Sequence, residues 1–90
     1  MNVDPTKPFL NDLKKIVDTS LKEKIEQSIA AVMKAVTIKD IPKLRKLKGY
    51  KPAIYYRIRV GSHRIGVTIE GNLATFARCL PRKDFYKNYP

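Results

Sequence analysis

Arginines and tyrosines at alternating positions are the residues of this sequence best suited to chemistry. Tyr55, Arg57 and Arg59 alternate with apolar residues, and Arg64 opens a second alternating run after the short segment 61–63. Because successive side chains of a strand point to opposite faces, this pattern predicts a hairpin with one apolar face and one arginine face. Guanidinium groups are permanently charged and suit phosphate oxygens, and tyrosine rings can stack on unpaired bases. The pattern therefore indicates a face that binds phosphate or nucleic acid.

Other catalytic patterns are absent from the sequence. His63 is the only histidine, and its place in the predicted turn favours an exposed, inert side chain. Cys79 is the only cysteine, and we expect it to be a small core residue. The acids after residue 45, Glu70 and Asp84, are too few to hold a divalent metal, and no glycine-rich phosphate loop is present. We therefore expect neither a metal nor a cofactor.

Positive charge is concentrated in the second part of the chain. The net charge is +11, yet residues 1–38 hold six Lys and Arg against five Asp and Glu, a net charge of +1. Residues 39–90 hold thirteen against three, a net charge of +10. A solubilising surface is one interpretation, but solubility needs no segregation of sign. The segregation favours a phosphate-bearing partner or an acidic protein.

Two amphipathic helices are predicted before the hairpin. Thr6 is a plausible N-cap for the first helix, and Ser20 with Glu23 forms a capping-box pattern at the start of the second. The apolar positions with helical spacing are Phe9, Leu10, Leu13, Ile16 and Val17, then Leu21, Ile25, Ile29, Val32, Met33 and Val36. We expect these stripes to be core and the short connection to give an antiparallel helical hairpin.

The remaining segments are shorter. Residues 1–5 are an edge strand or a tail, and residues 37–49 are a connector in which Ile41, Leu44 and Leu47 contact the core. Gly71 and Asn72 form a tight turn before a third strand at residues 73–80, and the tail from residue 82 begins a helical turn.

This order predicts a single α+β domain over residues 1–90, with an N-terminal helical hairpin packed on a small twisted antiparallel sheet. The helices should cover the apolar face and leave the arginine face open. The sequence has no run of about 18 apolar residues and no signal-peptide pattern, so we expect a cytoplasmic protein without membrane contact.

The motifs jointly resemble the RelE/ParE superfamily of bacterial and archaeal type II toxins. Lys46-Leu47-Lys48-Gly49-Tyr50 is followed by Tyr56-Arg57-Ile58-Arg59-Val60-Gly61, then Arg64, and finally Arg82-Lys83-Asp84-Phe85-Tyr86. The superfamily pattern is L-x-G-x-x-x-x-Y-R-I-R-x-G-x-Y-R with a terminal H-R-x-D-x-Y. With the two-helix segment included, the resemblance covers essentially the whole chain.

The resemblance implies an enzyme: a metal-independent, ribosome-dependent endoribonuclease without a cofactor. RelE-type toxins cleave mRNA in the ribosomal A site through a 2′,3′-cyclic phosphate, and an antitoxin that wraps the basic surface neutralises them. The residues that this comparison implies as catalytic are Arg64, Arg82 and Tyr86. Those implied in binding RNA or phosphate are Arg57, Arg59, Lys48, Tyr55 and Lys83. The expected partners are a cognate acidic antitoxin and mRNA in the ribosome.

The sequence also departs from the superfamily pattern. Arg57 and Arg59 stand where RelE-type enzymes often have lysine, His63 replaces an aromatic residue, and Pro81 replaces the terminal histidine. Tyr86, Lys83 and His63 remain candidates for the general base, because arginine stays protonated. Two alternatives therefore stay open: a ParE-like toxin that inhibits DNA gyrase by binding, and an inactive homologue that only binds a partner.

Overall fold

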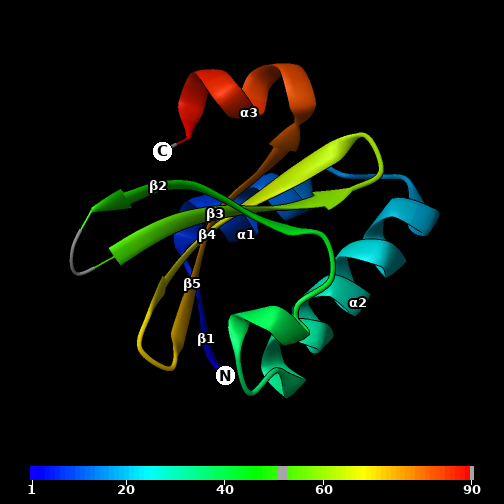
Figure 1. Ribbon diagram of the computed structural model, residues 1–90. Coiled ribbons are helices and arrows are strands. Elements are labelled where there is room, and N and C mark those ends of the chain that lie inside the picture. Colours follow the sequence, from blue (N-terminus) through cyan, green and yellow to red (C-terminus); the bar gives the residue numbers. More distant parts are fainter. Residues whose placement is uncertain (51–52, 90) are drawn as a thin grey trace.

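A five-stranded sheet lies at the centre of the molecule, with the strand order β1-β5-β4-β3-β2 (Figure 1). The computed structural model describes residues 1–50 and 53–89, and of residues 48–50 and 53 it describes the backbone alone. The strands are β1 (Asn2–Pro5), β2 (Leu44–Tyr50), β3 (Ala53–Val60), β4 (His63–Glu70) and β5 (Leu73–Pro81). Strands β2 to β5 pair antiparallel, and β1 pairs parallel with β5. The α+β class is confirmed, and residues 1–5 are an edge strand. The parallel pairing of this strand makes the sheet mixed, so the prediction of a wholly antiparallel sheet is wrong at this edge.

The predicted hairpin of β3 and β4 is confirmed. Gly61 in its turn has a φ of 58°, and Gly71 in the β4–β5 turn has a φ of 59°. Glycine adopts this left-handed region without the steric cost that a Cβ atom brings, so both turns occur where the sequence places a glycine. The hairpin register pairs Arg59 with Arg64, which puts these two side chains on the same face.

Helices α1 (Lys7–Lys14) and α2 (Thr19–Lys34) pack on one face of the sheet. The Thr6 cap is confirmed, because its side chain accepts a hydrogen bond from the backbone N–H of Phe9. The capping box at Ser20 is wrong: the N-cap of α2 is Asp18, whose carboxylate accepts from the N–H of Leu21 at 3.2 Å. Asp18 lies two residues earlier, and its negative charge also interacts favourably with the helix dipole.

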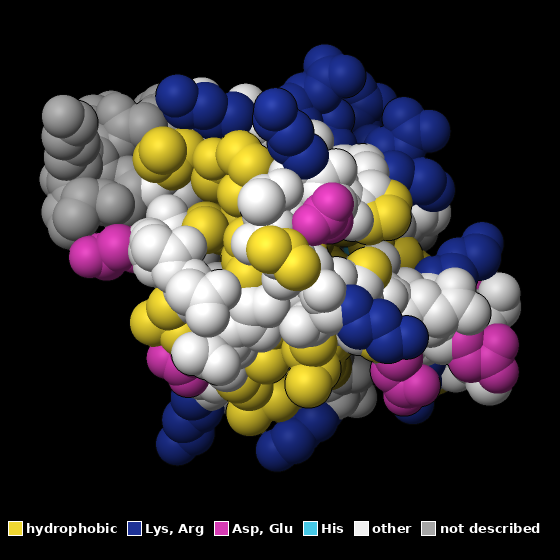
Figure 2. All heavy atoms as spheres, turned by 60° about the horizontal axis from the view of Figure 1, so that its bottom comes forward, with side chains coloured by type: hydrophobic (Ala, Val, Ile, Leu, Met, Phe, Trp, Pro, Cys, Tyr) yellow, Lys and Arg dark blue, Asp and Glu magenta, His cyan; other side chains and the backbone are white. Residues whose placement is uncertain are grey.

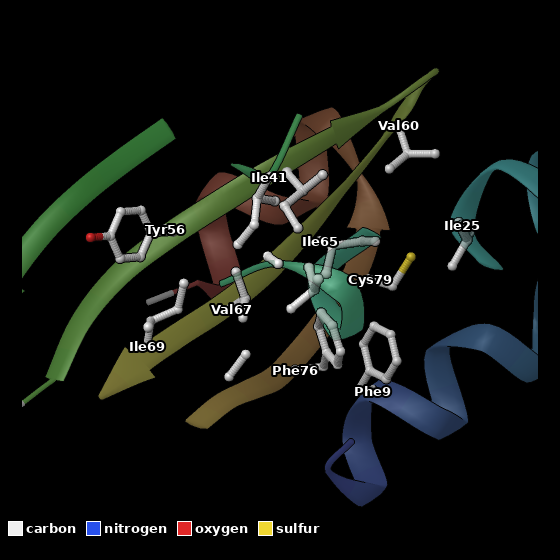
Figure 3. Packing of buried hydrophobic residues seen from close by; sticks show 14 of the residues in the cluster. Phe9, Ile25, Ile41, Tyr56, Val60, Ile65, Val67, Ile69, Phe76 and Cys79 are labelled. Carbon is white, nitrogen blue, oxygen red and sulfur yellow. The ribbon is translucent and has the colours of Figure 1, made fainter. Parts of the chain in front are cut away.

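The core lies between these two helices and the sheet (Figure 3). The ring of Phe9 stacks on Phe76 of β5, with ring centroids 5.2 Å apart. Alternate residues of the central strands point into this core: Tyr56, Ile58 and Val60 from β3, and Ile65, Val67 and Ile69 from β4. This alternation confirms the predicted apolar face of the hairpin.

The predicted apolar stripes of the helices are only partly core. Ile25 and Val32 are buried, but Leu10, Met33 and Val36 remain exposed, as does Val17 at 88%. The prediction that the stripes are core is therefore wrong at these four positions. Val17 and Val36 lie beyond the helix ends at Lys14 and Lys34, so they extend no buried stripe. Leu10 and Met33 lie on the solvent-facing sectors of α1 and α2, because a helix on a sheet buries only the sector that faces the sheet.

The connector predicted for residues 37–49 is in part a strand. A short 3₁₀-helix, η1 (Ile38–Asp40), is followed by β2, which pairs with β3. The register shifts between Lys46 and Lys48, so a bulge interrupts the alternation of β2. Leu44 and Leu47 are partly buried although they are three residues apart. The bulge accounts for this spacing, which concealed the strand in the sequence.

Helix α3 (Arg82–Asn88) lies against the opposite face of the sheet and extends the helical turn predicted for the tail. Phe85 and Tyr89 are buried, yet neither belongs to the core cluster between the sheet and the first two helices. The Tyr89 ring lies over Gly66 so closely that a Cβ atom there would be 2.8 Å from it. A glycine at this position of β4 therefore lets α3 approach the sheet.

The edge of β5 beyond β1 is protected by side chains. Asp12 of α1 is buried, accepts from the backbone N–H of Cys79 at 3.0 Å and forms an ion pair with Arg78 at 2.7 Å. This contact satisfies a strand edge that β1 is too short to cover and anchors α1 on the sheet. Within the described residues, no helix has the length and hydropathy needed to cross a membrane.

Candidate nucleic-acid interface

Arginines from three adjacent strands lie on the sheet face opposite α1 and α2. The register pairs Arg57 with Arg45 of β2, and Arg59 with Arg64 of β4. Directly opposed residues of antiparallel strands share a face, so these residues form one group. We call Arg45, Arg57, Arg59 and Arg64 the arginine face. The predicted gathering of Arg57, Arg59 and Arg64 agrees with this register.

Arg45 belongs to the arginine face, although the sequence pattern around it predicts a connector rather than a strand. Its place opposite Arg57 follows from the pairing of β2 with β3. A shallow groove of about 220 Å³ runs here, lined by Lys43, Leu44, Arg45, Arg57 and Arg59. The alternating charge of Lys43 and Arg45 around Leu44 was the sequence signal that could have identified it.

The arginine face has no acidic partner in residues 1–50 and 53–89. The ion pair that the structure gives, between Arg78 and Asp12, lies at the edge of β5 beside α1. Like charges directly opposite each other on neighbouring strands destabilise a sheet. Two such pairs side by side therefore favour an anion that bridges them.

Arg64 is held in one orientation by the turn that precedes it. Its guanidinium Nη1 donates to the carbonyl of Gly61 at 3.2 Å and to that of His63 at 3.0 Å. The side chain is 8% exposed, and its buried Nε–H has no hydrogen-bond acceptor among the described atoms. Burying an unpaired donor costs stability, which is more typical of a functional site than of a structural one.

Helix α3 brings three further predicted residues close to this turn. The backbone N–H of Arg82 donates to the carbonyl of Ser62 at 3.0 Å, so the helix begins beside the turn that holds Arg64. Arg82 and Lys83 are exposed in the first turn of the helix. Tyr86 is 51% exposed and makes an edge contact with Phe85 at 5.1 Å. All three side chains are therefore accessible to a ligand.

The last two predicted binding residues differ in what the structure describes. Tyr55 lies on the same side of β3 as Arg57, and its ring makes an edge contact with Tyr89 at 6.0 Å. Tyr55 thereby joins the arginine face to the end of α3. The backbone of Lys48 lies in β2, and its side chain lies outside the described part of the chain.

His63 lies on the other side of the sheet from the arginine face. It has the same parity in β4 as the core residues Ile65 and Val67, and it borders a cavity of about 510 Å³ together with Asp12 and Leu21. Burial lowers the pKa of His63 below its usual value. Of the three candidate bases, the structure thus separates His63 from the arginines and leaves Tyr86 and Lys83 on α3.

Buried Cys79 behaves as the predicted core residue. It is 2% exposed, and burial together with the nearby Asp12 carboxylate raises the pKa of its thiol to about 12. A thiol protonated at neutral pH is a poor nucleophile and a poor metal ligand. In the part of the chain that the structure describes, no three His, Cys, Asp or Glu side chains are grouped so as to hold a metal ion.

The surface reflects the segregation of charge. Figure 2 shows a cluster of Lys and Arg side chains at the upper margin of this view, and separate ones at the right, near the centre and at the lower margin among hydrophobic patches and acidic side chains. A basic region of this kind attracts anions over a distance set by the ionic strength.

Two helices on one face of a five-stranded sheet and arginines on the other make this a small α+β protein with a basic sheet face. Toxin RelE3 of Methanocaldococcus jannaschii is 36% identical to this chain over 91 residues, and the comparison covers 100% of both proteins. The chain therefore belongs to the RelE family of toxins. No model of a protein family matches the chain.

Solved structures show the same fold. In a RelB–RelE antitoxin–toxin complex from Methanococcus jannaschii, one chain is 32% identical with a TM-score of 0.74, over 97% of this chain and 99% of that chain. A chain of the archaeal RelE–RelB complex from Pyrococcus horikoshii has a TM-score of 0.75 at 16% identity, over 90% and 93%. The YoeB dimer from Staphylococcus aureus gives 0.68 at 24% identity, over 88% and 93%.

Proposed function

We propose that this protein is the toxin of a toxin–antitoxin pair and that it inhibits translation by cleaving mRNA in the ribosome without a metal. The observation that carries the proposal is the arginine face, where two like-charged cross-strand pairs have no acidic partner among the described residues. Membership of the RelE toxin family supports it.

Cleavage needs little covalent chemistry from the protein. The 2′-oxygen of the RNA attacks the adjacent phosphorus, the bond to the 5′-oxygen breaks, and a 2′,3′-cyclic phosphate remains. Negative charge develops on the phosphate oxygens in the transition state, where fixed donors stabilise it most. Arg64 suits this role because its hydrogen bonds to Gly61 and His63 fix its orientation before the RNA binds. Arg57 and Arg59 hold the backbone on either side.

The proton transfers require groups other than arginine. The 2′-hydroxyl loses a proton and the 5′-oxygen gains one, and a guanidinium stays protonated throughout. Tyr86 and Lys83 are exposed on α3, next to the turn that holds Arg64. We propose that Tyr86 stacks on a base or takes part in proton transfer and that Lys83 contacts phosphate.

The proposed partner is an acidic antitoxin that covers the arginine face in the resting cell. Structures of relatives contain RelB together with RelE. The net charge of +10 in residues 39–90 favours an anionic partner and rapid association with it. We propose that both proteins act in the cytoplasm, where translating ribosomes are found.

Mapping of RNA ends after induction tests the proposal. New mRNA ends with 2′,3′-cyclic phosphates should appear only when ribosomes are translating. Arg82→Ala should remove them, whereas Lys87→Ala, which removes another exposed positive charge from the same helix, should not. Growth arrest without new RNA ends would contradict the proposal. Full RNA cleavage by both single variants, Arg82→Ala and Arg64→Lys, would contradict it as well. DNA-damage signalling instead of RNA cleavage would indicate gyrase inhibition.

A further inference from the structure

A second basic cleft lies beside the arginine face, between α2 and the beginning of β2. It has a volume of about 440 Å³, which falls in the range of small-molecule sites. Its charged lining comes from three separate segments: Lys24 of α2, Lys43 just before β2, and Arg59 near the end of β3. Gln27 of α2 adds an amide that can donate hydrogen bonds. Cations are thus brought together in a concave place rather than spread over a surface.

The backbone at Lys43 is strained. Its φ is 61°, in the left-handed region, which residues other than glycine and asparagine seldom adopt. A turn at this position needs only a glycine, so the turn itself does not explain a lysine here. Strain that persists at a position where a permissive residue would relieve it is typical of a functional site. The lysine amine is the feature that a glycine would lack.

Lys43 and Arg59 also line the groove on the arginine face, so the cleft and the groove are contiguous. No acidic side chain lines either of them among the described residues. A ligand that extends from one to the other must therefore carry repeated negative charge. An RNA backbone has one negative charge per nucleotide and is flexible when single-stranded.

We propose that this cleft is a second phosphate subsite, which binds the backbone of the RNA strand one or more nucleotides away from the phosphate at Arg64. The inference rests on the proposed function and adds the course of the strand: from the arginine face, past Lys43, to α2. RNA is favoured over an acidic peptide because the two sites share Lys43 and Arg59, so one flexible strand with a negative charge at every nucleotide can occupy both.

Binding of non-cleavable RNA to the full chain tests this subsite. RNAs with 2′-O-methyl groups throughout, of about three and about eight nucleotides, would be titrated by fluorescence anisotropy at several salt concentrations. Lys24→Gln should weaken the longer RNA several-fold and lower the salt slope by about 0.7, the value for one single-strand phosphate contact. The shorter RNA should bind unchanged. Lys22→Gln is the matched control, because it lies on the same helix but lines the groove between α1 and α2.

Lys43→Gly provides a second variant, since it removes the amine and keeps the left-handed backbone. It should weaken RNA binding without loss of folding. If Lys24→Gln binds RNA like Lys22→Gln, the subsite is overturned while the proposed function stands. If wild-type protein yields no cleaved mRNA, yet its binding of the longer RNA depends on Lys24, the proposed cleavage fails and the subsite stands. If Lys24→Gln weakens an acidic peptide and not RNA, the cleft belongs to a protein partner and the inference is overturned.

Discussion

Arg64 combines a permanent charge with burial, two properties that seldom occur together in one side chain. Two backbone carbonyls bind its Nη1, and its buried Nε–H is left without an acceptor in the described chain. Removing such a charge from water is costly unless it is fully hydrogen-bonded. The arrangement is understandable if the site is built for an anion that completes it, because preorganised donors need no rearrangement when charge develops.

His63 is a candidate general base by its position in the sequence but not by its position in the fold. It adjoins Arg64 in the sequence, yet it lies on the helix side of the sheet. His63→Gln should therefore leave the rate of RNA cleavage and its pH profile unchanged. A shift of the profile toward higher pH would contradict this prediction, because it would show that the imidazole takes part in proton transfer.

The same variant has an independent readout in stability. Burial lowers the pKa of His63 in the folded protein, so the unfolded chain binds a proton more readily. The stabilising contribution is therefore complete above the unfolded pKa of about 6.5 and is lost as the pH falls below it. When the pH is lowered from 7.5 to 5, the unfolding temperature of His63→Gln should therefore fall less than that of the wild-type protein.

Strand β2 is the element that completes the arginine face, through the pair of Arg45 and Arg57. Arg45→Glu would replace a like-charged cross-strand pair by an opposite-charged one. Each cross-strand pair contributes roughly 0.2–1 kcal/mol, so the variant should unfold at a temperature several degrees higher. It should also bind RNA more weakly. Arg45→Gln, with the repulsion removed and no attraction added, should fall between the two in thermal unfolding.

Interpretation of this segment as a connector, without the pairing of β2 with β3, would give a different result. If Arg45 had no neighbour on an adjacent strand, as expected of a connector, Arg45→Glu would change stability by less than about 0.5 kcal/mol. Equal unfolding temperatures for Arg45→Glu and Arg45→Gln would therefore contradict the cross-strand pairing.

Helix α3 depends on Gly66 for its place on the sheet. A Cβ atom there would lie 2.8 Å from the Tyr89 ring, and a buried ring cannot move away freely. Gly66→Ala should cost about 1–3 kcal/mol, typical of overpacking, and should reduce RNA cleavage because it displaces the helix that carries Arg82 and Tyr86. Urea unfolding and a cleavage assay measure the two effects.

The smaller Tyr89→Leu side chain supplies the control for Gly66→Ala. Combined with Gly66→Ala, it should recover part of the lost stability, since the two positions are in contact and their effects are coupled. Strictly additive losses in the double variant would show that Tyr89 does not confine Gly66.

Most of the elements follow from local patterns, whereas their contacts do not. Alternation predicts β3, β4 and the shared face of Arg57, Arg59 and Arg64, because a strand has a period of two whatever it pairs with. The bulge in β2 breaks that period, so the strand, and with it Arg45, is visible only once its pairing is known. The approach of α3 to Gly66 likewise depends on contacts between distant segments.

Exposure of the helices is also set by the whole molecule. The spacing of Leu10 and Met33 suits a buried stripe, but a 90-residue chain has only one small sheet for its helices to cover. The ion pair of buried Asp12 with partly exposed Arg78 joins residues 66 positions apart in the sequence. No local pattern marks either residue as a partner of the other.

The whole molecule carries a net charge of +11 within extents of 34 × 27 × 22 Å. Those dimensions exceed the Debye length of about 8 Å at physiological ionic strength by a few-fold, so the repulsion acts mainly between neighbours such as the arginine pairs. A surface that merely solubilises and a surface that binds an anion differ in their response to ligands. Diffuse charge responds to ionic strength alone, while a site responds to the identity of the anion.

Thermal unfolding with matched additives separates these cases. A non-cleavable single-stranded RNA that binds the folded protein should stabilise it by about 2.7 kcal/mol at one hundred times its Kd. Any binding of the RNA to the unfolded chain reduces this stabilisation. Sodium chloride of equal ionic strength should raise the unfolding temperature much less, since it only screens repulsion. Arg57→Ala should lose most of the RNA effect and keep the salt effect. Equal shifts from RNA and salt would mean that the basic surface serves solubility, and that the arginine face is not a binding site.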